Sequence, residues 1–530
     1  MELDILVAGG LVYDGSGGAP VRADVGVVGD RIHVLDDLGA ATAGLRVDAS
    51  GLAVAPGFID THTHSDLVWQ LGDEHADVAM GTVRQGVTTE VAGNCGFTSY
   101  PCLPERRPLL ERHTGGVFGG GASAWNDLAG FREAATAAGL HANMAPLVGH
   151  GSLRVGVLGF ENRPPRDDEL HDMTALLEAA FEQGAFGLST GLIYMPGAYA
   201  RTEELIALAR SIARHGRPYV SHIRGESDMV ADSVREAIRI GREAGLPTHI
   251  SHHKASGRRN WGRTEETLGL IHAARAEGTD VTVDVYPYTA GSTVLQAVLP
   301  AWAQEGGIQA MVERLGDSRV RDRIRHEYAN WPSHLENLAG SAGWDRIVIA
   351  ACPGRPDIEG RTIVELASDA GRDAADFVFD LLVEQRARVL IVLHTMSEAD
   401  VTRVLASDVA MIGSDGIPVP GKPHPRWAGT FSRVLGRYGR DQRLFDLATA
   451  IRKMTSLPAG RFGLRGRGVL APGAAADLVV FDPDTVVDRA TYEDPLLPPD
   501  GIRDVFVNGI AAVLGGRPTG ARAGRVLTPG

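Results

Sequence analysis

Apolar runs in the middle of the chain alternate with amphipathic stretches. DDELHDMTALLEAAFEQG (167–184) and RTEELIALARSIARHG (201–216) have the spacing of helices. The apolar runs that predict strands are VAPGFIDTH (54–62), GVTTEVAGNC (86–95), HANMAPLVGH (141–150), AFGLSTGL (185–192), PYVSHIRG (218–225), PTHISHHK (247–254), VTVDVYPY (281–288) and DVAMIGSD (408–415). Such alternation is typical of parallel βα units. Eight strands favour an α/β fold with a TIM-like (β/α)8 barrel over an open sheet.

The two ends of the chain have another pattern, short apolar runs broken by turn residues. Asn508-Gly509 lies between two of these runs, which is a strong hairpin signal. Because chain ends often lie close together, we expect residues 1–55 and 465–530 to form one small β-sandwich beside a barrel of residues 56–464. The stretch from about 295 to 400 fits the barrel rhythm poorly. It predicts an insertion over the barrel mouth, with a further strand at 388–394.

Composition excludes several classes of partner. Lys+Arg number 52 and Asp+Glu 66, which gives a net charge of −14. An acidic chain without a basic stripe is not expected to bind nucleic acid. Three cysteines do not suggest a disulfide framework, and no apolar run approaches the ~18 residues that cross a bilayer. Together with Glu2 and Asp4, which replace the positive start of a signal peptide, these features predict a cytoplasmic protein without a membrane partner.

Residues that can bind a metal stand at the ends of five predicted strands. In a parallel barrel the carboxyl ends of the strands face one mouth, so these side chains should converge there. Imidazole, thiolate and carboxylate together are the ligand set of a zinc-type centre. The residues are His62, His64, Cys95, His222, His252 and Asp415.

Each of these residues also has a structural explanation when it is taken alone. A strand-end histidine or a buried Cys95 can simply pack, and Asp415 can cap a turn. A Gly-x-Ser-x-Gly pattern around Ser189 matches a serine-hydrolase motif but lacks its context, so Ser189 is expected to shape the turn after the fourth strand. Five strands that all end in metal-binding residues favour a metal centre.

Several motifs resemble a known family. APGFIDTHTHSD (55–66) resembles the first-strand signature of the amidohydrolase superfamily. The motifs EVAGNCGF, GLSTGLIYMPG, SHIRGE, SHHKASG, YPYTAGST and GSDG resemble the N-acyl-D-amino-acid deacylase (D-aminoacylase) family. The resemblance covers nearly the whole chain, including AADLVVFD around Asp477. It implies zinc-dependent hydrolysis of N-acyl-D-amino acids, which are small-molecule substrates, to a D-amino acid and a carboxylate.

The resemblance also implies how zinc is held. The fourth predicted strand has no lysine that could be carboxylated to bridge two metals, and Cys95 supplies a thiolate instead. Cys95, His222 and His252 would form one tight zinc site. His62, His64 and Asp415 would complete it or hold a second, weaker metal. His253 should point to the other side of its strand.

The expected reaction is attack on the amide by metal-bound hydroxide. Asp415 would shuttle the proton from the water to the departing amine. The stretch VLQAVLPAW (294–302) contains no Arg or Lys, and an acidic side chain would need a cation in its pocket. We therefore expect apolar D-residues to be preferred.

Two cations are candidates for binding the free α-carboxylate of the substrate. Lys254 is two residues after His252 and should face the same mouth, and Arg426 follows Asp415 by eleven residues. By the resemblance, the pocket is further lined by Tyr194, Tyr286 and Ser292. Arg224 and Glu226 are expected to pair with each other.

Two alternatives remain at this point. A cyclic-amide hydrolase of the hydantoinase or dihydroorotase kind would use the same barrel, but the missing lysine and the presence of Cys95 count against it. A catalytically silent scaffold would be expected to lose its ligands, and Asp415 is retained. The oligomeric state is open, a homo-oligomer included.

Overall fold

A closed parallel barrel forms the centre of the computed structural model, which describes residues 2–38, 41–118, 123–332 and 335–529. Its strands, in chain order, are β6 (Phe58–Asp60), β7 (Val87–Ala92), β8 (Asn143–Pro146) with β9 (Val148–Gly149), β10 (Leu188–Gly191), β11 (Tyr219–His222), β12 (Thr248–Ile250), β13 (Val281–Val285) and β17 (Ala410–Ile412). The short pieces β8 and β9 together make up one of the eight predicted strands. The ring closes where Thr61 donates from its N–H and its hydroxyl to the carbonyl of Ile412, at 3.5 and 3.0 Å. The strand order and this closure confirm the predicted (β/α)8 barrel.

Apolar side chains fill the barrel interior. Ile59, Val91 and Val220 from three strands pack together there with Leu147, between β8 and β9, and with Phe462, which ends α17. The interior is therefore a packed core rather than a pore, and the chemistry of the barrel must lie at its mouth.

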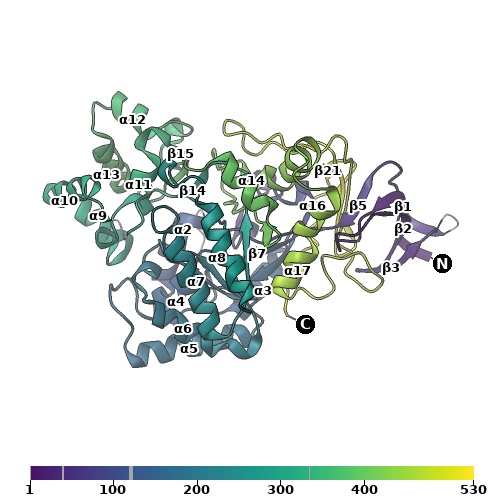
Figure 1. The fold of residues 1–530 in the computed structure, drawn as a ribbon, viewed down its shortest axis with the longest axis horizontal. Coiled ribbons are helices and arrows are strands. Elements are labelled where there is room, and N and C mark those ends of the chain that lie inside the picture. The colour runs from purple at the N-terminus through teal and green to yellow at the C-terminus, as the bar shows by residue number, and fades with distance from the viewer. Residues whose placement is uncertain (1, 39–40, 119–122, 333–334, 530) are drawn as a thin grey trace.

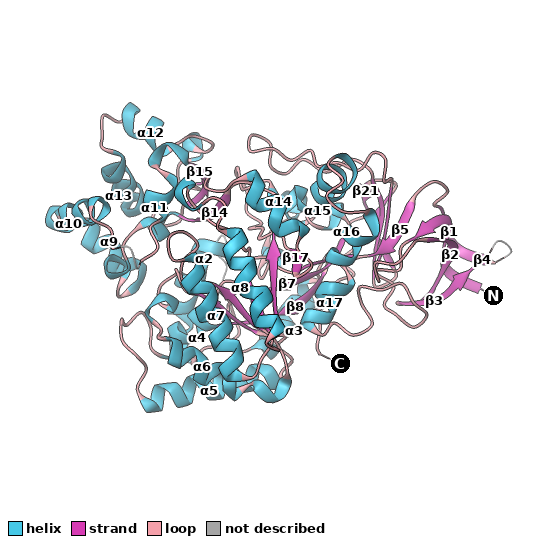
Figure 2. Ribbon diagram, viewed as in Figure 1, coloured by secondary structure: helices cyan, strands magenta, loops and turns pink. Residues whose placement is uncertain are grey.

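Helices cover the outside of the barrel strands (Figure 2). In α7 (Val230–Ala244), for example, Val230, Val234 and Ile238 follow one another at helical spacing and form one buried face. The helices that precede the insertion are α1 (Ala76–Ala79), α2 (Arg107–Phe118), α3 (Leu128–Ala138), α4 (His150–Val157), α5 (Asp167–Glu182), α6 (Thr202–Ser211), α7 (Val230–Ala244) and α8 (Thr264–Ala276). Those that follow it are α14 (Glu398–Ala406), α15 (Arg426–Arg433), α16 (Leu447–Met454) and α17 (Ser456–Phe462).

The two chain ends build one sheet at the side of the barrel (Figure 1). Its described strands are β1 (Glu2–Val12), β2 (Val21–Val28), β3 (Arg31–Asp36), β4 (Thr42–Asp48), β5 (Ala53–Pro56), β18 (Leu478–Phe481), β19 (Ile502–Val507), β20 (Ile510–Leu514) and β21 (Arg517–Pro518). Antiparallel pairing of β5 with β18 joins the two ends, and side chains of both, such as Val54 and Val480, share one core. Asn508 and Gly509 form the turn between β19 and β20, so the hairpin prediction is confirmed. The boundaries at residues 55 and 465 stay a proposal.

A separate unit with its own core lies between β13 and α14. Its sheet pairs the central β16 (Leu390–Leu393) with β14 (Gly291–Val294) and β15 (Ile347–Ala351). The predicted strand at 388–394, which the sequence could not place, is thus β16. Its helices are α9 (Gly307–Leu315), α10 (Ser318–Ala329), α11 (Leu338–Ala342), α12 (Ile363–Asp369) and α13 (Ala374–Glu384). None of the helices in the described ranges is long and apolar enough to cross a membrane.

Candidate metal centre

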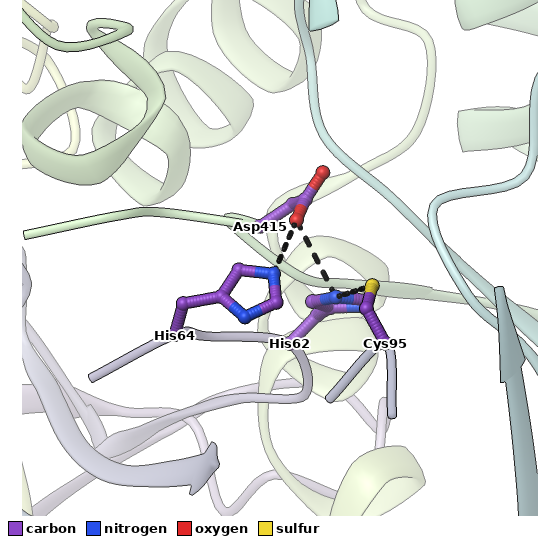
Figure 3. A group of neighbouring side chains, drawn as sticks. All are labelled: His62, His64, Cys95 and Asp415. Atoms are coloured by element: carbon purple, nitrogen blue, oxygen red, sulfur yellow. Dashed lines mark hydrogen bonds and ion pairs between the residues drawn. The ribbon is translucent and has the colours of Figure 1, made fainter. Parts of the chain in front are cut away.

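The six candidate ligands meet at the barrel mouth. Two groups with ligand atoms within 4.8 Å of one another share Cys95: one adds His62, His64 and Asp415, and the other adds His222 and His252. The Cys95 Sγ lies 3.4 Å from His62 Nε2, and 3.5 Å from both His222 Nδ1 and His252 Nε2. On the other side, Oδ1 of Asp415 lies 3.4 Å from His62 Nε2 and 3.3 Å from His64 Nε2 (Figure 3).

Most of these residues stand just beyond the strand ends rather than on the strands. Cys95, His252 and Asp415 have positive φ angles of 53°, 36° and 52°, so the backbone turns sharply at each. Close backbone packing accompanies the turn at Cys95, because a Cβ on Gly191 would lie 2.0 Å from the Cys95 carbonyl oxygen. Ser189 donates to the carbonyl of Gly93 and accepts from the N–H of Gly96. It therefore supports the loop that carries Cys95, after the second barrel strand, rather than the turn after its own strand.

The chemistry of the donor set fits a zinc ion. Burial alone would raise the pKa of the Cys95 thiol, but the neighbouring His62 and His252 hold it well below its usual value. A thiolate among imidazoles and a carboxylate is the environment that zinc prefers. All six side chains are buried, which limits competition from water.

Sequence reasoning missed Asp284, which supports two of the candidate ligands, His62 and His252. Its Oδ2 lies 3.3 Å from His62 Nδ1 and 2.9 Å from His249 Nε2, and its Oδ1 accepts from the His252 N–H at 2.7 Å. Burial would raise the pKa of Asp284, yet His62 and His249 hold it below its usual range. A buried carboxylate of this kind fixes the tautomer and orientation of a metal-binding imidazole. The available signal was a lone acid in the apolar run VTVDVYPY (281–288).

Asp415 and Arg426 form a buried ion pair. NH1 of Arg426, the first residue of α15, lies 2.7 Å from Asp415 Oδ2. Burial would raise the pKa of Asp415, but Arg426 and the nearby histidines hold it well below its usual value. The carboxylate therefore stays ionised around neutral pH, with its other oxygen toward the imidazoles.

Lys254 faces the same mouth as His252 but has protein partners. Its Nζ lies 2.6 Å from Glu226 Oε1 and 2.7 Å from His252 Nδ1. The expected pairing of Glu226 with Arg224 is wrong, because Arg224 reaches Glu236 on α7 at 2.9 Å.

His253, by contrast, points away from the mouth as predicted. Its Nε2 lies 2.8 Å from Thr267 Oγ1 on α8, and its ring is buried there.

A pocket of about 450 Å³, mouth included, opens beside the candidate ligands. The insertion contributes Leu338 and Leu393 to its wall, so it covers the barrel mouth. Arg426 lies behind the pocket, with its guanidinium 4.7 Å from the ring centre of Tyr286 and a hydrogen bond to the Ser292 carbonyl at 3.2 Å. The predicted site residues on the pocket wall are Tyr194, His222, His252, Lys254, Tyr286, Ser292 and Asp415.

A second, largely apolar pocket adjoins the first, with which it shares Ile193 and Tyr194. Burial lowers the pKa of His113 to about 4, so its ring is neutral at pH 7. The described residues that line this pocket are therefore all uncharged. Its wall includes Phe97, Val117, Phe160, Met195, Val294, Ala297 and Met311.

Comparison with known proteins gives this site its context. The profile of the Amidohydrolase family matches residues 46–511. A D-aminoacylase of Alcaligenes xylosoxydans xylosoxydans is 42% identical, and the match covers 99% of this chain and 97% of the relative. An N-acyl-D-glutamate deacylase of the same organism is 39% identical, with 99% of this chain and 96% of the relative covered. The structure of an N-acyl-D-glutamate deacylase from Bordetella bronchiseptica, complexed with zinc and a phosphonate inhibitor, covers all of both chains with a TM-score of 0.83 at 38% identity. The chain therefore belongs to the amidohydrolase family, among the D-aminoacylases and related deacylases that its motifs resemble.

Proposed function

We propose that this protein hydrolyses the amide bond of N-acyl-D-amino acids in a zinc-dependent reaction, releasing a D-amino acid and a carboxylate. The observation that carries the proposal is the convergence of Cys95, His222 and His252 beside a pocket that Lys254 lines and behind which Arg426 lies. The full-length similarity to a D-aminoacylase, an N-acyl-D-glutamate deacylase and an N-acyl-D-aspartate deacylase, at 37–42% identity, supports it.

Zinc would be held at the shared thiolate. We assign the tight site to Cys95, His222 and His252, whose ligand atoms lie close together. In this proposal His62, His64 and Asp415 complete that site or hold a second, weaker metal. Bound zinc lowers the pKa of a water molecule to about 7 and polarises a carbonyl. The thiolate contributes the negative charge that balances the cation.

Asp415 is the proposed proton shuttle. Its Oδ1 faces the imidazoles while Arg426 holds its Oδ2, so the carboxylate is fixed and ionised. It would accept a proton from the attacking water and deliver it to the departing amine. Burial of the carboxylate limits exchange of that proton with solvent.

Lys254 and Arg426 would bind the free α-carboxylate. Both cations lie near the Tyr286 ring, at 5.6 and 4.7 Å from its centre. Tyr194 and Ser292 line the same pocket. A carboxylate between two buried cations forms charge-assisted hydrogen bonds, which fix the substrate for attack.

The adjoining pocket would take the side chain of the D-residue. Its apolar wall and the absence of Lys, Arg, Asp and Glu among its described residues favour D-Leu, D-Met or D-Phe over D-Glu or D-Asp.

The three cysteines form no disulfide bond, which supports a reducing, cytoplasmic location for the protein.

The function can be tested by measuring zinc content and kcat/KM for N-acetyl-D-leucine, its L-enantiomer, N-acetyl-D-glutamate and a hydantoin. We expect bound zinc and turnover of the D-leucine substrate above all others. Turnover of the hydantoin alone would indicate a cyclic-amide hydrolase. An absence of turnover with every N-acyl-D-amino acid would refute the proposal.

A further inference from the structure

We propose that Glu226 is a positioning residue that orients a zinc ligand and a substrate-binding cation at the same time. The two groups are His252 and Lys254. This inference rests on the proposed function, because it assigns a role within the same site.

One carboxylate oxygen of Glu226 makes both contacts. Its Oε1 lies 2.9 Å from His252 Nδ1 and 2.6 Å from Lys254 Nζ. The same oxygen is 3.9 Å from Nε2 of His222, a second candidate ligand. Glu226 is 7% exposed, so water cannot readily replace these contacts.

The chemistry of an imidazole explains why His252 needs this carboxylate. His252 turns its Nε2 toward the Cys95 thiol, at 3.5 Å, and this is the nitrogen available to a metal. A neutral imidazole that binds a metal through Nε2 carries its proton on Nδ1, which then requires an acceptor. Lys254 has only donors to offer, so the Glu226 carboxylate must accept from Nδ1.

The same tautomer decides what Lys254 can do. A protonated Nδ1 cannot accept from the Lys254 ammonium, although the two nitrogens lie 2.7 Å apart here. Lys254 then keeps Glu226 as its anchor and has donors to spare for the carboxylate of a substrate. Glu226 in this way connects the metal site with the substrate pocket.

The backbone of Glu226 is held from both sides, which fixes its side chain in place. The N–H groups of Glu226 and Ser227 donate to Oε2 of Glu336 in the insertion, at 2.8 and 3.1 Å. On the other side, the carbonyl of Glu226 accepts from the N–H of Ser256 at 2.7 Å. The insertion therefore takes part in positioning Glu226.

The test compares Glu226→Gln with Glu236→Gln, a matched carboxylate-to-amide change at a residue that pairs with Arg224 outside the site. Zinc affinity is measured by chelator competition on metal-free protein, and KM and kcat at saturating zinc. For Glu226→Gln we expect zinc affinity to fall 10- to 100-fold, as is usual when the partner of a metal-binding histidine is removed, and KM to rise. Glu236→Gln should match the parent, and Lys254→Met should raise KM without weakening zinc binding.

Zinc affinity within twofold of the parent in Glu226→Gln would overturn the inference, and so would equal losses in Glu226→Gln and Glu236→Gln. If Glu226→Gln does not fold, Glu226→Asp keeps the charge with a shorter reach and is expected to bind zinc more weakly. Parent-like zinc binding in that variant would also overturn the inference. A protein that binds zinc but hydrolyses no N-acyl-D-amino acid would refute the proposed function, while its zinc affinities would still decide the role of Glu226.

Discussion

Backbone conformation at single residues shows how strongly the fold constrains its metal site. Cys95, His252 and Asp415 all have φ angles between 36° and 53°, and such a conformation costs on the order of 1–3 kcal/mol for a residue other than glycine. Specific hydrogen bonds hold the backbone turns at His252 and Asp415. The N–H of His252 donates to Asp284, and the N–H of Asp415 donates to the His62 carbonyl, both at 2.7 Å. The geometry of the ligands is thus imposed by the protein before a metal binds.

Replacing the thiol at the centre of the site should abolish metal binding. Cys95 contacts three imidazoles and belongs to both groups of candidate ligands, so Cys95→Ala is expected to lose bound zinc and activity together. The control is Cys102→Ala, since Cys102 is buried outside the site and its pKa is raised to about 11 by burial. Elemental analysis and activity assays provide the measurements. Full zinc content in Cys95→Ala would mean that the thiol only packs.

Removing the negative charge of Asp415 should affect turnover more than folding. Asn is nearly isosteric and keeps the three residues assigned to the tight zinc site, but it cannot accept the proton of the attacking water. We expect Asp415→Asn to lower kcat by about 10²- to 10⁴-fold with a native circular dichroism spectrum. Asp408→Asn, an exposed change seven residues earlier, serves as the control. A kcat within about tenfold of the parent would contradict the shuttle role.

Among the elements, α5 shows how a helix start depends on one carboxylate. Glu169 accepts two hydrogen bonds from the Arg163 guanidinium, at 2.6 and 2.8 Å, and one from the Arg166 N–H at 2.8 Å. The hydrogen bonds from Arg163, opposed by burial, lower the pKa of Glu169 to about 2. A lowered pKa in the folded state means that the stabilisation is present above the unfolded value of 4.5 and is lost as pH falls toward 2.

Glu169→Gln should therefore destabilise the protein in a pH-dependent way. At pH 7 we expect a loss of about 1–2 kcal/mol, since hydrogen bonds to charged groups are removed from a partly solvated pair. The difference in unfolding free energy between parent and variant should narrow as pH is lowered from 5 to 3. Denaturant unfolding at several pH values measures it, with Asp168→Asn on the same turn as the control. A difference that does not change with pH would show that the ion pair contributes nothing.

The strands were predictable from the sequence, whereas the long-range hydrogen-bond partners of individual side chains were not. Runs such as 281–288 are apolar because both faces of a barrel strand are buried, and this pattern is local. The partners of Asp284 and of Glu226 depend on which strands lie side by side, and no local pattern contains that. Arg224 is a clear case: its expected partner is two residues away, but its side chain turns to Glu236 on α7.

At the scale of the whole molecule, one buried acid joins the small β domain to the barrel. Asp477, just before β18, accepts from the Asn508 N–H at 2.8 Å and pairs with Arg467. Asn143 at the start of β8 lies 3.4 Å from the same carboxylate and accepts from the Asn508 side chain at 2.7 Å. Residues more than three hundred positions apart therefore share one hydrogen-bond network.

Truncating this acid should weaken the whole molecule without changing its metal site. Asp477→Ala leaves the nearly buried Arg467 without its counter-charge, and breaking a buried pair costs about 3–5 kcal/mol. We expect a lower midpoint of thermal unfolding, with zinc content and KM of the folded fraction unchanged, because the network lies at the amino-terminal end of β8 and the ligands lie beyond the carboxyl ends of the strands. Asp482→Asn, after the same strand, is the control. An unchanged midpoint would show that this network does not contribute to holding the two units together.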